Sequence, residues 1–504
     1  MYKNSKRIAK NTILLYARMI VVMIVTLYTS RVVINALGID DFGIYTAVGG
    51  FVAMFAVISN SLSAAISRYI TFELGKKEGG CVTDVLSVSL FLQIGIGLLL
   101  LLVSFFFGLD FVEDCMTIPL ERLHVAKYVF LFSVLMFVVN LLNVPFISMI
   151  IAFERMNAFA YIGVLEVLGR FGIAMYITQQ ECDKLILYSF LLFLYSLIIL
   201  VFYILYCRCN FIDCKINIRP RFSLIKEIFS FTGWNFVGSA SGVLRDQGVN
   251  LLLNVFYGLV VNASRGIAMQ VSSAVTQFTN SFTTALNPQI TKLYASGEIA
   301  SSIDLVLKGA RFSFFLVLLL VVPLMLETEW VLVKWLNIVP EHTVCFVRLV
   351  LINVAIDSLS SAMITLMLAT GRIRNYQIIV GGCLVLNFPI SYLFLKYGCS
   401  PESVFIVSIV ISILCLILRL IMLNRMLRFP IRVFLNDVVF RVGATTFLSL
   451  LLPVFVYSIS PSTSMRVVIL FLLSVFSTLI AIYCVGLTKK EREFVFSKIK
   501  NAVM

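Results

Sequence analysis

Two adjacent charges, Arg245 and Asp246, lie near the middle of a mostly apolar run that covers residues 229–258. A charged side chain at the centre of a bilayer costs at least roughly 2.5 kcal/mol, so such residues persist only where they face protein or water. A guanidinium offers forked N–H donors that match phosphate oxygens, and a carboxylate can bind a proton or a cation. The pair therefore predicts a polar interior that handles charged groups.

Other apolar runs carry further charges. The deep arginines outnumber the deep acids, which predicts a net basic interior suited to an anionic cargo. The candidates to bind this anion are Arg18, Arg31, Arg245 and Arg265. Glu166 and Arg170 stand four residues apart on one helix face, and we expect a buried pair that is either structural or part of the cavity. Basic residues nearer the ends of the runs are expected to extend to lipid headgroups: Arg68, Lys127, Arg311, Arg348, Arg419 and Arg441.

Two interpretations of Arg245 and Asp246 stay open. Successive residues on a helix point about 100° apart, so the two side chains can reach different partners. If both charges are structural, Asp357 is the acid that we expect beside Arg245. Alternatively, Arg245 binds the anion, while Asp246 and Asp357 bind Na⁺ or H⁺ as a coupling ion. Desolvation of a carboxylate when the cavity closes would favour its neutralised form and so link ion occupancy to conformation.

The elements that must position these residues are membrane-spanning helices. The chain has 504 residues, of which 60% are hydrophobic and 13% charged, and its mean hydropathy is +1.01. Apolar runs of about 18 residues or more predict an all-α fold with about fourteen transmembrane helices. They cover residues 11–36, 42–67, 84–108, 125–151, 157–178, 185–207, 230–257, 260–286, 309–331, 343–370, 375–397, 402–424, 438–459 and 464–487.

Lysine and arginine alternate between the predicted connections. Most basic residues outside the spans fall in every second connection, which by the positive-inside rule lies in the cytoplasm, as do both termini. The two histidines and eleven cysteines have no spacing typical of a metal site. The short loops hold no set of residues for acid–base catalysis. We therefore expect no catalytic residues, no metal and no cofactor apart from a coupling ion.

An internal repeat divides the chain. The segment NSLSAAISRYIT at 60–71 resembles NSFTTALNPQIT at 280–291, and both start with Asn-Ser. The copies fall in the second and eighth predicted spans, so the two halves share one orientation and are related by a pseudo-two-fold axis along the membrane normal. We predict a six-helix lobe at 1–207, a basic cytoplasmic linker at 208–229, a second six-helix lobe at 230–428, an additional hairpin at 438–487 and a cytoplasmic tail at 488–504.

Polar residues follow one face of several predicted helices. Asn, Gln and Thr recur there at three- or four-residue spacing, more often than the packing of helices against each other requires. Such a stripe is typical of a water-filled surface that can form hydrogen bonds with sugars. It consists of Asn60, Asn250, Asn254, Gln270, Gln277, Asn280 and Thr284.

Several motifs resemble those of a known family. They are Arg31 in the first span, Leu37-Gly38, FGIY at 42–45, LSAAISR at 62–68 and GVLRDQGVNLLLNVFYG at 242–258. With them the chain resembles the Wzx-type polysaccharide flippases of the multidrug/oligosaccharidyl-lipid/polysaccharide exporter superfamily, over its first twelve spans. Fourteen spans are more typical of the related peptidoglycan-precursor flippases, so the subfamily stays open.

The resemblance implies a function. Such a protein would move an undecaprenyl-pyrophosphate-linked oligosaccharide from the cytoplasmic to the periplasmic leaflet of a bacterial inner membrane, by alternating access of two lobes. Its partners would be this cargo, the bilayer and other polysaccharide-assembly membrane proteins, not nucleic acid. One alternative is a drug/cation antiporter of the same superfamily, for which we would expect an acidic, aromatic cavity. Another is a membrane-embedded polysaccharide polymerase or ligase, for which the short outer loops leave little room.

Overall fold

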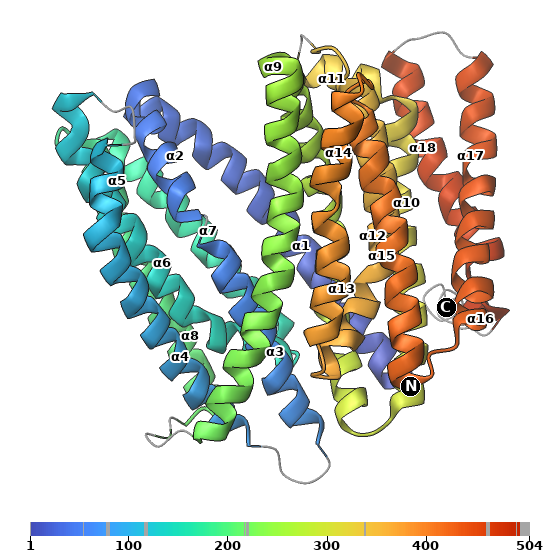
Figure 1. Ribbon diagram of the computed structural model, residues 1–504, viewed down its shortest axis with the longest axis horizontal. Coiled ribbons are helices and arrows are strands. Elements are labelled where there is room, and N and C mark those ends of the chain that lie inside the picture. Colours follow the sequence, from blue (N-terminus) through green and yellow to red (C-terminus); the bar gives the residue numbers. More distant parts are fainter. Residues whose placement is uncertain are drawn as a thin grey trace, which may run out of the picture. The chain divides into compact units, whose positions relative to one another are not determined.

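The computed structural model describes residues 2–53, 55–76, 81–114, 119–215, 217, 221–336, 339–459, 464–489 and 491–493. No strand occurs among these residues, which confirms the predicted all-α fold (Figure 1). The α-helices are α1 (Tyr2–Leu37), α2 (Ile39–Ala53), α3 (Ala56–Gly75), α4 (Val82–Val103), α5 (Leu109–Asp114), α6 (Leu123–Ala152), α7 (Met156–Thr178), α8 (Lys184–Asn210), α9 (Phe222–Ala295), α10 (Ile299–Leu326), α11 (Thr328–Leu336), α12 (Thr343–Ala369), α13 (Arg374–Val385), α14 (Asn387–Lys396), α15 (Ser403–Leu427), α16 (Ile431–Phe434), α17 (Arg441–Ile459) and α18 (Ser464–Ala481). Parts of the predicted linker (216 and 218–220) and tail (490 and 494–504) lie outside the described residues.

The protein is a multi-pass membrane protein. Among the described residues, 11 helical stretches are long and apolar enough to cross a membrane, and each overlaps a predicted span. The stretches that match the predicted spans 309–331 and 438–459 begin earlier, at residues 299 and 431. The remaining predicted spans fall on α2, α3 and α9. The span predicted at 42–67 is divided between α2, which has 15 residues, and α3. Helix α9 contains many Asn, Ser and Thr residues, which lower its hydropathy. The count of fourteen stays a prediction.

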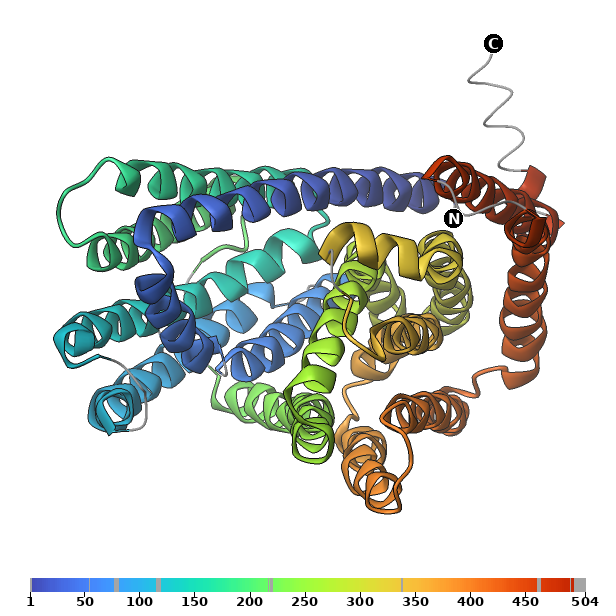
Figure 2. The same cartoon turned by 90° about the horizontal axis from the view of Figure 1, so that it is seen from above.

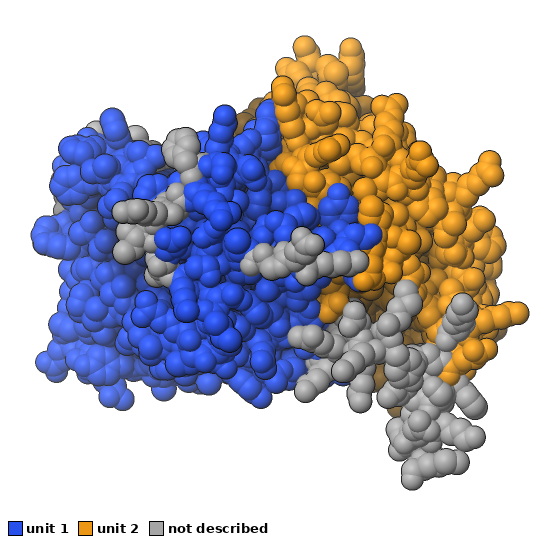
Figure 3. All heavy atoms as spheres, turned by 90° about the horizontal axis from the view of Figure 1, so that it is seen from below, with its two compact units in different colours: residues 1–239, 291–297 blue, residues 240–290, 298–504 orange. Residues whose placement is uncertain are grey.

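One compact unit comprises residues 1–239 and 291–297 (blue in Figure 3). Within it α1 packs along α7, and α6 packs against α3 and α8 (Figure 2). Its core is apolar around α2 and α6, where Val48, Ala126 and Val129 are fully buried. These contacts join helices that are distant in the sequence through aliphatic side chains.

An arginine between two acids ties helices of this unit together. Nη2 of Arg122 lies 2.6 Å from Oδ2 of Asp41 in α2, and Nη1 lies 2.5 Å from Oδ2 of Asp183. The other carboxylate oxygen of Asp183 accepts the backbone N–H groups of Leu185 and Ile186, and so caps the start of α8. The forked guanidinium thus joins α2 to the start of α8.

The other compact unit comprises residues 240–290 and 298–504 (orange in Figure 3). Here α10 packs against α12, and α12 packs against α15. Helices α17 and α18 form a hairpin that contacts α10. Small hydroxyl residues of this hairpin, among them Thr445, Ser474 and Thr478, are fully buried, as is typical where helices approach closely inside a membrane.

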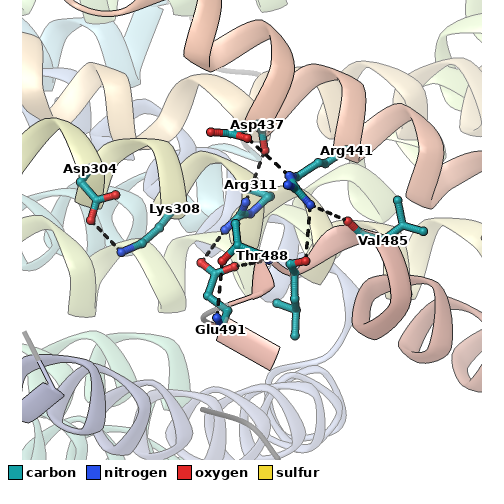
Figure 4. A network of polar contacts seen from close by, with 9 residues as sticks. Asp304, Lys308, Arg311, Asp437, Arg441, Val485, Thr488 and Glu491 are labelled. Carbon is teal, nitrogen blue, oxygen red and sulfur yellow. Dashed lines mark hydrogen bonds and ion pairs between the residues drawn. The ribbon is translucent and has the colours of Figure 1, made fainter. Parts of the chain in front are cut away.

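A buried network links the residues after α18 to α10 (Figure 4). Arg311 of α10, with 4% of its side chain exposed, donates from Nη2 to Oε1 of Glu491 at 2.5 Å. Oε2 of Glu491 accepts the backbone N–H of Thr488 at 2.8 Å, and Thr488 Oγ1 accepts the N–H of Glu491 at 3.4 Å, which is a capping box. Arg441 donates to the carbonyl oxygens of Val485 and Leu487 at 3.1 and 3.4 Å.

Two of the arginines expected at lipid headgroups lie elsewhere. Arg311 is buried in the network with Glu491, and Arg419, which is 7% exposed, donates to Ser360 Oγ at 3.1 Å. For these two residues the expectation was wrong, because partners on other helices satisfy the guanidinium before it reaches the membrane surface. Hydropathy along the chain carries no information about such partners.

Glu491→Gln is expected to destabilise the protein by about 3 kcal/mol, because it leaves the buried guanidinium of Arg311 without its ion-pair partner. Thermal unfolding of the purified protein and its abundance in the membrane measure this effect. Glu493→Gln is the matched control, since Glu493 is exposed two residues further on. Equal unfolding temperatures for the two variants would contradict the assignment.

Candidate functional site

A cavity of about 370 Å³ lies within the unit formed by 240–290 and 298–504. Helices α9, α12 and α15 line it. Four charged residues, Arg245, Asp246, Arg265 and Asp357, contribute to the lining together with amide and hydroxyl side chains. The structure thus brings together two predicted anion-binding arginines and both predicted coupling acids. This volume falls in the range of pockets that hold small ligands.

A single glycine shapes the cavity. Gly258 interrupts α9 with a φ of 78° and a ψ of −167°, a conformation that residues with a Cβ rarely adopt. The helical segments before and after it, 222–257 and 259–295, then lie close enough for side chains to join them. Arg265 of the second segment donates from Nη2 to the carbonyl oxygen of Asp246 at 2.6 Å and from Nη1 to Oδ1 of Asn250 at 3.2 Å.

Arg245 and Asp246 contact each other. Nε of Arg245 donates to Oδ1 of Asp246 at 3.1 Å, with 22% and 43% of the two side chains exposed. This differs from the interpretation in which each charge has its partner on another helix. Asp357 forms no ion pair with Arg245 but acts on it electrostatically from a greater distance. The long, flexible side chain of Arg245 can bend toward Asp246 although the Cα–Cβ bonds of the two residues diverge. The result is an internally neutralised pair at the cavity wall.

Two charges of the cavity keep no ion pair. Arg265 is 8% exposed and donates to two neutral acceptors, a carbonyl and an amide. Asp357 accepts a hydrogen bond from Nδ2 of Asn353 at 3.2 Å. In the described part of the chain, neither has an oppositely charged partner within 4 Å. The four charges also sum to zero, so this cavity does not have the net basic character that the sequence predicted. Among the described residues that line it, one cation, Arg265, and one anion, Asp357, form no ion pair.

The predicted polar stripe is only partly in this cavity. Asn280 lines the cavity, and the side-chain oxygen of Asn250 accepts a hydrogen bond from the lining residue Arg265. Thr284 donates to the carbonyl oxygen of Asn280 within its own helix. The remaining members, Asn60, Asn254, Gln270 and Gln277, are exposed and do not line it. Asn60 belongs to the unit formed by 1–239 and 291–297.

The other predicted residues also belong to that unit. The guanidinium of Arg18 lies 4.2 Å from the ring centroid of Phe159, a cation–π contact, and Arg31 is exposed. Glu166 and Arg170 form the predicted pair, with 2.6 Å between Oε1 and Nη2. Their side chains are 29% and 41% exposed, so the expected burial of this pair was wrong.

Residues of α12 and α15 were missed as lining residues. Asn353, Ser358 and Ser361 of α12 and Ser408 of α15 face the cavity beside Asp357. Their spacing along α12 is a detectable signal, because 353, 357, 358 and 361 share one helix face. Of the residues on this face, only Asp357 was predicted from the sequence.

The overall fold is similar to that of solved transporters. The bent conformation of a MATE protein matches with a TM-score of 0.73 and 14% identity, over 84% of this chain and 96% of that one. A multidrug resistance MATE family transporter of the MOP superfamily in its outward-facing conformation matches with a TM-score of 0.71 and 14% identity, over 82% of this chain and 94% of that one. A MOP superfamily transporter from Pyrococcus furiosus, described as having a binding pocket of reverse polarity, matches with a TM-score of 0.70 and 13% identity. The match covers 81% of this chain and 94% of that one. At these identities the likeness shows the fold alone.

Sequence comparison gives the family. No protein of curated function matches the chain. A family model described as "Polysaccharide biosynthesis protein" matches residues 8–294, more than half of the chain. The matched range includes Arg245, Asp246 and Arg265 and ends before Asp357. The chain therefore belongs to the polysaccharide biosynthesis protein family and has the fold of the MATE transporters.

Proposed function

We propose that this protein is a flippase that moves an undecaprenyl-pyrophosphate-linked oligosaccharide from the cytoplasmic to the periplasmic leaflet of a bacterial inner membrane. The observation that carries the proposal is the cavity at Arg245, Asp246, Arg265 and Asp357 in a chain of the polysaccharide biosynthesis family. Its amide and hydroxyl lining offers hydrogen bonds to sugar hydroxyls. The cavity holds a part of the cargo, since a whole oligosaccharide exceeds about 370 Å³.

The anionic part of the cargo would bind Arg265. Its guanidinium already donates to a carbonyl and an amide, which are neutral acceptors. A pyrophosphate oxygen would replace them with a charged acceptor, and such hydrogen bonds are shorter and stronger. Arg245 would also bind the pyrophosphate once an ion on Asp246 has freed Arg245 from its pair with that carboxylate. Arg18 and Arg31 of the other unit stay candidates for earlier or later positions of the same group.

Asp246 and Asp357 would bind the coupling ion, Na⁺ or H⁺. Among the described residues, Asp357 forms no ion pair, and the ion-pair partner of Asp246 is Arg245. An ion on Asp246 competes with Arg245 for the carboxylate, and an anion on Arg245 competes with Asp246 for the guanidinium. Cargo and ion would therefore each loosen the pair for the other, which is a reciprocal coupling of two ligands.

A drug/cation antiporter is the second candidate. One observation favours it: the cavity is balanced in charge and contains two carboxylates, instead of being net basic as a cavity for an anion alone should be. Asp357 would then bind a cationic substrate.

Depletion of the protein separates the two candidates. A flippase is expected to leave lipid-linked oligosaccharide accumulated in the cytoplasmic leaflet, at least about tenfold above the normal level, because synthesis continues while transfer stops. Extraction and mass spectrometry of the polyprenyl lipids measure this accumulation, and complementation with the intact chain is the control. Changed tolerance to cationic drugs without such accumulation would support the antiporter and exclude the flippase.

A further inference from the structure

Two hydrogen bonds lie near Gly258, at the end of the cavity-lining helices where α9 turns. The hydroxyl of Tyr257 donates to the carbonyl oxygen of Cys399 at 2.6 Å, between α14 and α15. Ser264, which is fully buried, donates to the carbonyl oxygen of Glu341 at 2.7 Å, just before α12. The turn of α9 is thus joined to the starts of two other cavity-lining helices.

An ionisable pair joins the same two helix starts to each other. Nδ1 of His342 and Oε1 of Glu402 are hydrogen-bonded, and the proton lies on the ring nitrogen because a carboxylate only accepts. His342 precedes α12 and Glu402 precedes α15. The side chains are 33% and 19% exposed, so water reaches the pair.

An aromatic stack connects this pair to the cavity. The ring of His342 lies 5.8 Å from that of Phe346, which is fully buried and lies 4.4 Å from the ring of Phe405. Phe405 lines the cavity. Separation of the helix starts would therefore displace a side chain of the cavity wall.

We propose that Tyr257, Ser264, His342 and Glu402 form a pH-sensitive clasp that holds this end of the cavity closed and tightens when His342 is protonated. On the predicted topology this end faces the outside of the cytoplasmic membrane. The inference rests on the proposed function in treating the cavity as the transport path. An acidic exterior would then favour the state in which the cavity is closed to that side.

The titratable and charged groups near His342 and Glu402 determine the sign of the pH dependence. Glu402 is in direct contact, Arg348 and Cys345 follow on α12, Tyr257 comes from α9, and Glu341 precedes His342 in the chain. Burial alone would raise the pKa of the Glu402 carboxyl, but hydrogen bonds from Ser400 and His342 hold it below its ordinary value. Glu402 therefore stays charged while a histidine changes charge between about pH 5 and 8. The clasp is tighter at the lower end of this range, and it is lost only at a much lower pH, where Glu402 itself takes up a proton.

Hydrogen–deuterium exchange of the full-length protein in nanodiscs tests the clasp. The reporters are amides in the first turns of α12 and α15, such as those of Phe346 and Ile406, which donate to the carbonyls of His342 and Glu402. Each rate is divided by the intrinsic chemical rate at that pH. We expect protection of these amides to be about three- to fivefold higher near pH 6 than near pH 8, as a partly exposed ion pair allows.

Three variants complete the test. His342→Gln should remove the pH difference, and Glu402→Gln should lower protection at both pH values. His124→Gln is the matched control, because His124 makes an edge-to-face contact with Tyr128 in the other unit, and this variant should keep the difference. A pH difference that persists in His342→Gln, or full protection in Glu402→Gln, would overturn the proposal. The measurement needs no cargo, so it stands or fails independently of the proposed function.

Discussion

Asp246→Asn is expected to bind lipid-linked cargo normally and to lose the stimulation of flipping by an imposed ion gradient. Asparagine keeps the shape of the side chain and an acceptor for Arg245, but it carries no charge for Na⁺ or H⁺ to neutralise. The gradient-dependent part of the rate should fall at least about tenfold, which corresponds to an increase of about 1.4 kcal/mol in the activation free energy. Flipping in proteoliposomes, with each gradient imposed in turn, measures the rate.

The same chemical change away from the cavity is the control. Asp304→Asn removes an acid that pairs with Lys308 at 2.6 Å on α10 and does not line the cavity. It should keep full gradient dependence. Asp357→Asn, by contrast, should lose it as Asp246→Asn does. Unchanged gradient dependence in a folded Asp246→Asn protein would assign Asp246 a structural role alone.

Arg265→Lys is expected to lose nearly as much flipping activity as Arg265→Ala. The guanidinium of Arg265 serves two acceptors at once, the carbonyl of Asp246 and the amide of Asn250. A lysine ammonium keeps the charge but has no forked geometry. Hydrogen bonds to a charged group contribute about 1.5–3 kcal/mol each, so losing one of the two should slow flipping about tenfold or more.

Arg372→Lys is the control for this substitution, because Arg372 is exposed in the connection before α13. Flipping rates and unfolding temperatures of both lysine variants separate a transport defect from a folding defect. If Arg265→Lys flips cargo at the normal rate, the charge alone is enough, and forked recognition of phosphate at this position is wrong.

The sequence by itself determined the membrane-spanning helices and the charges within them. Hydropathy is a local property, since about 20 consecutive apolar residues suffice to define a helix that crosses the bilayer. The predicted all-α fold and most of the span positions follow from this rule alone. Charges inside such runs are visible for the same reason, and Arg245, Asp246, Arg265 and Asp357 were all found in this way.

Only the tertiary structure decided which of these charges meet. The turn at Gly258 brings Arg265 to the carbonyl of Asp246, although nineteen positions separate them. Asp246 pairs with its neighbour Arg245, and Arg311 pairs with Glu491, which the chain places far away. Such partners depend on how each helix is rotated about its axis and on where it is interrupted. Both are set by the packing of side chains on other helices, and no window of consecutive residues contains that information.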